Sequence, residues 1–148
     1  MTTDLKLING KIFFRGELIE ANLEINNGKI SSIGSNNSNE AEKIIDLENK
    51  LILPGMIDEH VHFRDPGYTH KANFETESKA AAMGGITTVY EMPNTKPPVT
   101  NVKRFEEKKE TVDKKSYVDY ALFAQIDQES VETDDIKKLN EKGVIGYK

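Results

Sequence analysis

The sequence has 148 residues, with 20 Lys and Arg against 25 Asp and Glu, and a formal net charge of -5. Its 36% hydrophobic and 30% charged residues fit a soluble globular protein of ordinary domain size. The acidic excess offers no basic face for nucleic acid, no apolar stretch could cross a bilayer, and no cysteine is present for a disulfide or a Cys zinc site. Because residues 1–20 also lack the pattern of a signal peptide, we expect a cytoplasmic protein with neither nucleic-acid nor membrane partners.

Residues 1–52 are predicted to form a small antiparallel β-unit, a portion of a β-sandwich. Asn-Gly pairs most readily adopt the positive φ angles of a tight hairpin turn, and such pairs occur at 9–10 and 27–28 between apolar segments. A further strand is expected at 43–47, after a polar loop. The polar turns of this unit carry no recognisable chemistry.

Residues 53–148 change to short β-rich segments that alternate with helical ones, a pattern typical of βαβ units and a parallel sheet. We expect strands at 56–63, 86–90, 117–124 and 144–148, and helices at 74–83, 100–115 (capped by Thr100) and 133–142. Such a series fits either a compact four-stranded open sheet or the first half of an eight-stranded barrel. A half barrel leaves two unpaired edges, but doubling it approaches the roughly 200–250 residues of a full barrel.

The sharpest motif starts at Asp58 and reads Asp-Glu-His-Val-His-Phe-Arg-Asp-Pro-Gly. Side chains two apart in a strand share a face, so His60 and His62 are expected to project together, in a row with Asp58 and Arg64. Two neutral imidazoles so placed can bind one divalent metal ion. The alternative is a core histidine beside a chance neighbour, but two of the three histidines on one face favour ligation. His70 is expected on a surface loop.

Two further positions are candidates for ligand contacts. Asn94 lies in a proline-framed loop at 91–98, which can hold an amide over a pocket, although a turn-forming Asn is the alternative. Lys148 ends the fourth strand and could face the same mouth as the histidines. It is an exposed terminal residue, a nucleophile, or a lysine that reacts with carbon dioxide to give a metal-bridging carbamate. The small residues at 80–89 favour close helix–strand packing.

Taken together, these segments resemble the dihydroorotases of the amidohydrolase superfamily. The resemblance is carried by residues 60–67, 81–88, 92–97 and 143–148. Hydantoinases and allantoinases resemble the sequence in the His-x-His strand and the Ala-rich helix. They usually differ at Arg64 and in the 92–95 loop, so these positions point to dihydroorotase.

The resemblance implies a (β/α)8 barrel of the TIM type, preceded by the small β-unit, with one or two zinc ions at its carboxyl mouth. His60 and His62 would bind the more buried ion, and Lys148, N6-carboxylated, would bridge the pair. Arg64 and Asn94 would hold the substrate carboxylate, which suits a guanidinium fork and a fixed amide. The implied reaction is the reversible hydrolysis of the ring amide of dihydroorotate to N-carbamoyl-aspartate, in pyrimidine biosynthesis.

The family also has two more His ligands and a general-base Asp, which we expect beyond residue 148 together with the rest of the barrel. The alternative is a genuine fragment, poorly folded and inactive. Two other functions stay open: a hydantoinase-, dihydropyrimidinase- or allantoinase-like cyclic amide hydrolase, and a non-catalytic barrel homologue that acts as a scaffold. A small-molecule substrate is the expected partner, and a homo-oligomer is compatible with the sequence.

Overall fold

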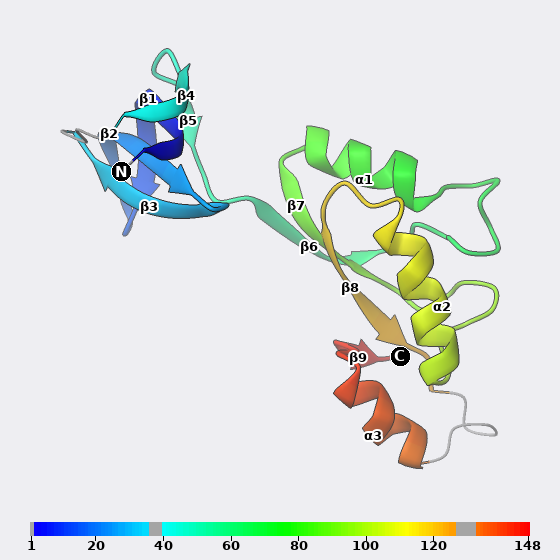
Figure 1. Cartoon of the computed structure of the whole chain (residues 1–148). Coiled ribbons are helices and arrows are strands. Elements are labelled where there is room, and N and C mark those ends of the chain that lie inside the picture. The colour runs from blue at the N-terminus through cyan, green and yellow to red at the C-terminus, as the bar shows by residue number, and fades with distance from the viewer. Residues whose placement is uncertain (1, 36–39, 127–132) are drawn as a thin grey trace. The chain divides into compact units, whose positions relative to one another are not determined.

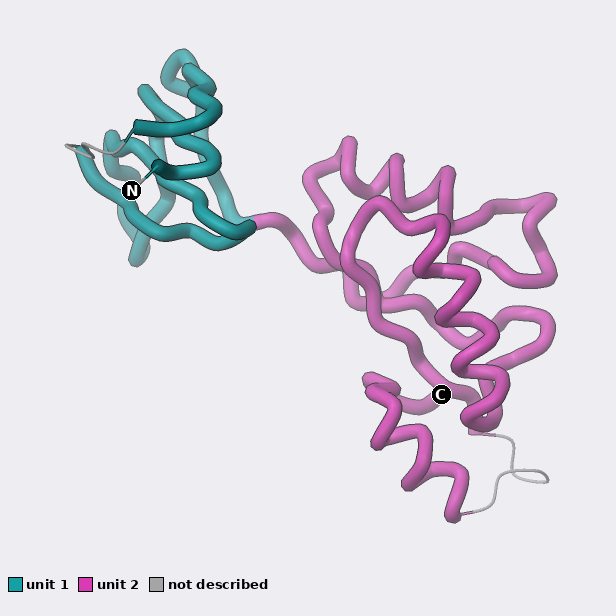
Figure 2. The backbone as a smooth tube through the Cα atoms, viewed as in Figure 1, with its two compact units in different colours: residues 1–54 teal, residues 55–148 magenta. Residues whose placement is uncertain are grey.

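The computed structural model describes residues 2–35, 40–126 and 133–148. The chain divides into two compact units, Met1–Pro54 and Gly55–Lys148, which Figure 2 shows in different colours. The boundary lies after Pro54, whereas the sequence pattern puts it after residue 52. Over the described part of the chain, no helix is both long and apolar enough to span a membrane.

The first unit is a mixed sheet. Its described strands are β1 (Thr3–Phe14), β2 (Glu17–Asn26), β3 (Lys29–Gly34), β4 (Ala41–Asp46) and β5 (Leu51–Ile52). β1, β2 and β3 pair antiparallel, but β4 and β5 both pair with β1 in parallel. The expected purely antiparallel unit is therefore wrong. After β3 the chain does not turn back on its neighbour; β4 joins the opposite edge of the sheet, beside β1 and in the same direction.

One of the two predicted Asn-Gly turns is present. The pair at 27–28 joins β2 to β3 with positive φ angles, as predicted. At Asn9 the prediction is wrong, because β1 continues through this position with a bulge and turns instead at 15–16. Asn9 has partners on both sides: its N–H donates to Asn22 Oδ1 at 3.3 Å, and its Nδ2 donates to Asp46 Oδ2 at 3.0 Å. The positive φ of Asn9 therefore belongs to a β-bulge, which these contacts across the sheet hold in place, and not to a hairpin turn.

The second unit is a parallel sheet in the order β6-β7-β8-β9, with a helix after each of the first three strands (Figure 1). Its elements are β6 (Met56–Val61), α1 (Phe74–Met83), β7 (Ile86–Glu91), α2 (Val102–Asp113), β8 (Asp119–Ala124), α3 (Thr133–Glu141) and β9 (Gly146–Tyr147). All its strand pairs are parallel. The predicted βαβ series is confirmed.

Asparagine caps fix where two of these helices begin. Asn73 Oδ1 accepts the Thr76 N–H at 3.0 Å at the start of α1, and Asn101 Oδ1 accepts the Arg104 N–H at 3.0 Å at the start of α2. The prediction that Thr100 caps this helix is therefore wrong, because the cap of α2 is Asn101. Each such cap satisfies a backbone donor that the first helical turn leaves unpaired.

The core of this unit lies between the helices and one face of the sheet. Its buried side chains come from α1, α2, α3, β7, β8 and the adjoining loops: Phe63, Phe74, Val89, Val99, Phe105, Val112, Leu122, Ala124 and Leu139. Figure 1 shows α1 and α2 along this face. Side chains alternate along each strand, so the intervening residues lie on the opposite face, which the described helices leave open. The candidate site lies there.

Candidate metal and substrate site

A pocket of about 410 Å³ opens on the helix-free face of the parallel sheet. It is lined by residues of all four strands and the segments that follow them: Glu59, His60, Tyr90, Met92, Phe123, Ile145, Tyr147 and Lys148. His60 from β6 and Lys148 from the end of β9 thus line one pocket, at the carboxyl edge where parallel sheets place their sites. Lys148 is exposed, and its ammonium has no partner among the described residues.

The two histidines of the motif lie side by side. His60 is in β6 and His62 directly follows it, with ring centroids 5.2 Å apart and planes tilted by 55°. The alternation of a strand predicts this placement. Two imidazoles at this separation can contribute nitrogen ligands to one divalent ion, so the donor set fits zinc. Among the described residues, no group of three or more His, Cys, Asp or Glu could hold a metal.

The predicted row does not extend to Arg64. The chain leaves the strand after Val61, and Arg64 has a φ of 66°, in the left-handed region. Its side chain is half-buried, and its guanidinium has no ion-pair or hydrogen-bond partner among the described residues. The side chain of Asp58 is engaged by the backbone instead: its Oδ1 accepts the N–H of His60 at 3.1 Å. The predicted row from Asp58 to Arg64 is therefore interrupted, because β6 ends and a loop begins before Arg64.

Asn94 contacts a predicted metal ligand directly. Its Oδ1 lies 2.6 Å from His62 Nδ1, although the two residues are 32 positions apart. The loop around Asn94 is held by its own hydrogen bonds: the Thr95 hydroxyl donates to the Pro97 carbonyl at 3.0 Å, and the Lys96 N–H donates to the Pro66 carbonyl at 3.0 Å. The loops after β6 and β7 are thus joined where their candidate residues meet.

A buried ion pair lies beneath this loop, on the helix side of the sheet. Glu91 and Lys108 have side chains that are 0% and 2% exposed, with Lys108 Nζ 3.6 Å from Glu91 Oε1. Glu91 Oε2 accepts the N–H of Phe63, next to His62, at 2.8 Å. Burial raises the pKa of Glu91 and lowers the pKa of Lys108, each against the opposing charge of its partner. Sequence analysis missed the pair. The available signal is a lysine on the apolar stripe of α2, between Phe105 and Val112.

A second buried carboxylate, that of Asp65, holds the loop after β6. Asp65 Oδ2 is 2.7 Å from Lys115 Nζ and accepts the Phe74 N–H at 3.3 Å. Glu91 and Asp65 therefore fix the backbone on both sides of Arg64. Carboxylates that accept backbone N–H groups in a buried site restrain the chain strongly, since leaving those donors unpaired is costly.

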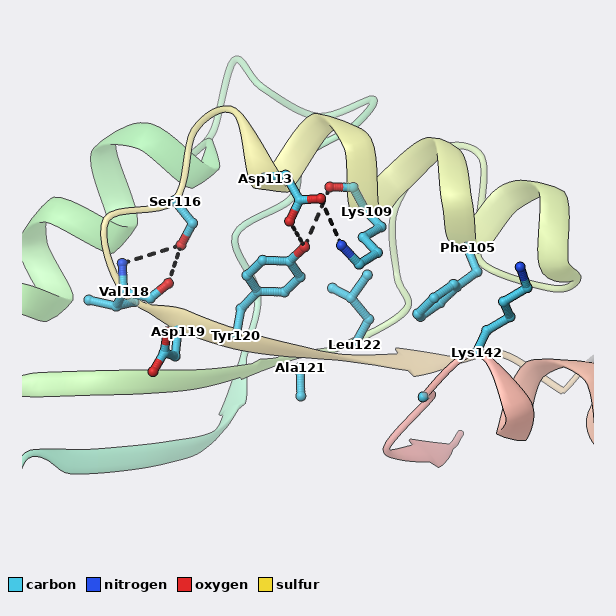
Figure 3. Close-up of a pocket in the computed structure, with 11 residues that line it drawn as sticks. Phe105, Lys109, Asp113, Ser116, Val118, Asp119, Tyr120, Ala121, Leu122 and Lys142 are labelled. Atoms are coloured by element: carbon cyan, nitrogen blue, oxygen red, sulfur yellow. Dashed lines mark hydrogen bonds and ion pairs between the residues drawn. The ribbon is translucent and has the colours of Figure 1, made fainter. Parts of the chain in front are cut away.

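A second pocket, of about 440 Å³, lies on the helix side of the sheet between α2, β8 and residues 142–143, which follow α3 (Figure 3). Figure 3 shows the Tyr120 hydroxyl and the Lys109 ammonium both directed at Asp113. Burial and the hydrogen bond to Asp113 raise the pKa of Tyr120. These polar groups satisfy one another and no histidine lies among them, so this pocket reflects helix–sheet packing. His70 lies on an exposed turn, as predicted, with its ring 6.4 Å from that of Tyr68.

The parallel sheet, the paired histidines at the end of β6 and the joined loops define an α/β protein with a candidate metal site at the carboxyl edge of its sheet. A family model described as dihydro-orotase-like matches residues 49–148. The chain belongs to this family.

Curated relatives carry the name dihydroorotase. The chain is 42% identical to the dihydroorotase of Methanosarcina acetivorans over 144 residues, which are 97% of this chain and 30% of that protein. It is 46% identical to the dihydroorotase of Pyrococcus abyssi over 113 residues, 76% of this chain and 28% of that protein. The chain therefore spans less than a third of the length of these relatives.

Solved structures of hydantoinases have a fold similar to that of this chain. The L-hydantoinase (dihydropyrimidinase) of Arthrobacter aurescens superimposes with a TM-score of 0.89 at 34% identity, over 98% of this chain and 32% of that one. A D-hydantoinase (dihydropyrimidinase) from Thermus sp. gives a TM-score of 0.80 at 27% identity, over 97% of this chain and 32% of that one. The order of strands and helices in this chain is thus shared with longer enzymes.

Proposed function

We propose that the whole protein is a dihydroorotase, which reversibly hydrolyses dihydroorotate to N-carbamoyl-aspartate in the cytoplasmic synthesis of pyrimidines. The observation that carries this proposal is the meeting of the two loops: Asn94 contacts His62, and Arg64, two residues after His62, has a guanidinium with no partner among the described residues. Residues suited to a carboxylate therefore adjoin residues suited to a metal. The family and the names of the curated relatives support the same reaction.

We also propose that β6–β9 form the first half of a (β/α)8 barrel, with two further His ligands and a general-base Asp supplied by later strands. Within the described residues, β6 pairs only with β7 and β9 only with β8, so both edges of this sheet can accept further strands. The likeness to L-hydantoinase over 32% of that chain supports a longer fold of the same order.

One or two zinc ions would be held by His60, His62 and an N6-carboxylated Lys148. Zinc, when bound, supplies Lewis acidity that generates hydroxide at neutral pH and polarises the amide to be cleaved. The lysine contributes by adding its neutral amine to carbon dioxide and releasing one proton, which leaves a carbamate whose single negative charge is shared by two oxygens. His60 and Lys148 line the same pocket, which is what a shared site requires.

Arg64 and Asn94 would hold the substrate carboxylate. The guanidinium of the half-buried Arg64 offers a planar pair of donors that matches a carboxylate, and nothing in the described part of the chain pairs with those donors. The amide nitrogen of Asn94 also has no partner among the described residues, while its oxygen is held by His62. Both residues therefore present donors, which suits an anionic group.

A substrate panel with the full-length protein tests the proposal. We expect turnover of dihydroorotate to exceed that of hydantoin, dihydrouracil and allantoin, and His60→Ala or His62→Ala to abolish it. Arg64→Ala should lower kcat/KM for dihydroorotate by about 10- to 100-fold, the value of a charged hydrogen bond, and leave hydantoin turnover unchanged. Arg104→Ala, on the exposed face of α2, is the matched control. An unchanged rate on dihydroorotate in Arg64→Ala would remove the substrate assignment.

The alternative with a specific observation in its favour is a hydantoinase-like activity. Solved hydantoinase structures share the fold of this chain, one of them with a TM-score of 0.89. Hydantoin and dihydrouracil carry no carboxylate, so an enzyme built for them gains nothing from Arg64. Higher turnover of hydantoin than of dihydroorotate, insensitive to Arg64→Ala, would favour this alternative. Zinc binding without turnover of any cyclic amide would favour the non-catalytic homologue.

A further inference from the structure

The contact between Asn94 and His62 determines which nitrogen of His62 carries the proton. The two atoms involved are the Asn94 amide oxygen and His62 Nδ1, 2.6 Å apart. An amide oxygen can only accept, so Nδ1 must donate its hydrogen in this pair. In a neutral imidazole the other nitrogen, Nε2, then holds the lone pair that a metal ion needs.

We propose that Asn94 is a positioning residue for His62: its amide oxygen holds the ring in the Nδ1–H tautomer and directs Nε2 toward the metal, while its amide nitrogen is left to donate to the ligand. This inference rests on the proposed metal site and extends it by one residue that serves both the ligand and the metal. It differs from a role in substrate contact alone, because it assigns the two ends of the amide to different partners.

The loop gives Asn94 the rigidity that this role requires. Its neighbours Pro93 and Thr95 are buried, and the Thr95 N–H donates to the Pro93 carbonyl at 2.8 Å. The Thr95 hydroxyl closes the loop from the other side on Pro97, at 3.0 Å. An amide on a loop of this kind has little freedom to turn away from His62.

Because its oxygen is held by His62, the Asn94 amide favours one kind of ligand, an acceptor of hydrogen bonds. A freely rotating amide can present either a donor or an acceptor to a pocket, whereas an amide whose oxygen is occupied presents only N–H groups. Donation from the amide nitrogen to an anion polarises the group and strengthens its oxygen as an acceptor for Nδ1–H. Anion binding and metal binding are therefore expected to reinforce each other, and by linkage the reinforcement is reciprocal.

Two substitutions separate the two ends of the amide. Asn94→Ala removes both, whereas Asn94→Asp keeps an oxygen acceptor for Nδ1–H and removes the donor. Lys96→Ala, an exposed side chain in the same loop, is the matched control. All variants are made in the full-length protein, and circular dichroism spectra verify that they fold.

The first measurement is the zinc dissociation constant of the metal-free protein, by competition with a chromophoric chelator. Asn94→Ala should weaken zinc binding by about 10- to 100-fold, the usual effect of losing a hydrogen-bond partner behind a metal-ligating histidine. Asn94→Asp and Lys96→Ala should bind zinc within a few-fold of the wild type. Both Asn94 variants should lose affinity for N-carbamoyl-aspartate in calorimetry, and the Asp variant should lose more. Wild-type zinc affinity in Asn94→Ala would overturn the inference.

The second measurement needs no metal. Long-range ¹H–¹⁵N correlation spectra of histidine-labelled, metal-free protein report the tautomer of each ring, and His62→Gln identifies the signals of His62. We expect the Nδ1–H form in the wild type and in Asn94→Asp, and a mixture of tautomers in Asn94→Ala. An Nε2–H ring in the wild type would overturn the inference. An Nδ1–H ring in a wild type that binds no zinc would overturn the proposed metal site and leave the positioning contact standing.

Discussion

At the scale of single residues, Lys108 reaches the carboxylate of Glu91 at a place where neither side chain meets water. Buried ion pairs add little net stability, because taking both charges out of water offsets their attraction. The pair is therefore better explained by the backbone that Glu91 holds in place than by a gain in stability. Glu91 receives the N–H of Phe63, directly beside His62, and so fixes the point at which β6 ends.

Removing the lysine alone tests the pair. At about pH 7, Lys108→Met should lower the free energy of unfolding by about 3–5 kcal/mol, since it leaves Glu91 charged and uncompensated. Burial raises the pKa of Glu91, so the stability linked to its protonation is present at low pH and is lost as pH rises through the folded-state pKa. The defect should therefore shrink as pH falls toward about 5.

Urea denaturation of the full-length protein at the two pH values measures this defect. Lys109→Met, on the exposed side of the same helix, is the matched control and should have little effect at either pH. The double variant Glu91→Gln with Lys108→Met should recover most of the loss, because it removes both buried charges. A defect in Lys108→Met that is equal at both pH values would contradict an uncompensated carboxylate as its cause.

At the scale of elements, the loops after β6 and β7 approach each other at Gly67. This residue has a φ of 97°, and a Cβ there would lie 2.3 Å from the carbonyl oxygen of Lys96. Only glycine permits this approach, because other residues would meet both backbone strain and a backbone clash. Under the proposed function the contact matters for more than packing, since Arg64 and Asn94 lie on the two loops that it joins.

Gly67→Ala should separate these loops. We expect a loss of stability of about 2–4 kcal/mol, from positive-φ strain and crowding together, and a higher KM for dihydroorotate. Gly16→Ala is the control: its φ of 90° is similar, but nothing lies within 4 Å of an added Cβ. Its loss should be smaller, with KM unchanged. Equal losses in both variants, measured by urea denaturation, would mean that the loops do not depend on this contact.

How far the sequence predicts these elements depends on how local each signal is. The α1 range and the pairing of His60 with His62 follow from local periodicity and capping, and the structure has both. The parallel partner of β4 and the bulge at Asn9 depend on contacts across the sheet, which no local pattern contains. Arg64 leaves the strand row for a similar reason: Glu91, distant in sequence, accepts the N–H of Phe63 before it, and the distant Lys115 pairs with Asp65 after it.

At the scale of the whole molecule, the parallel sheet exposes two edges within the described residues, at β6 and β9. The side chain of Ile57 on β6 is 60% exposed. Natural proteins cover such edges or protect them with charged residues, because an unpaired apolar strand recruits other strands. The proposed barrel would cover both edges with strands of the longer protein, whereas a compact open sheet would have to tolerate them.

Residues 1–148 produced alone should therefore self-associate. Sedimentation velocity should show a weight-average sedimentation coefficient that rises with concentration. Ile57→Lys should reduce the rise, since a charge on an edge strand opposes strand addition. Met83→Lys, a similar change at an 89% exposed position on α1, should not, because Met83 lies on a helix and puts no charge on the unpaired strand. A monomer at every concentration would show that the four strands form a self-sufficient open sheet, and would remove the unpaired edges as support for a barrel.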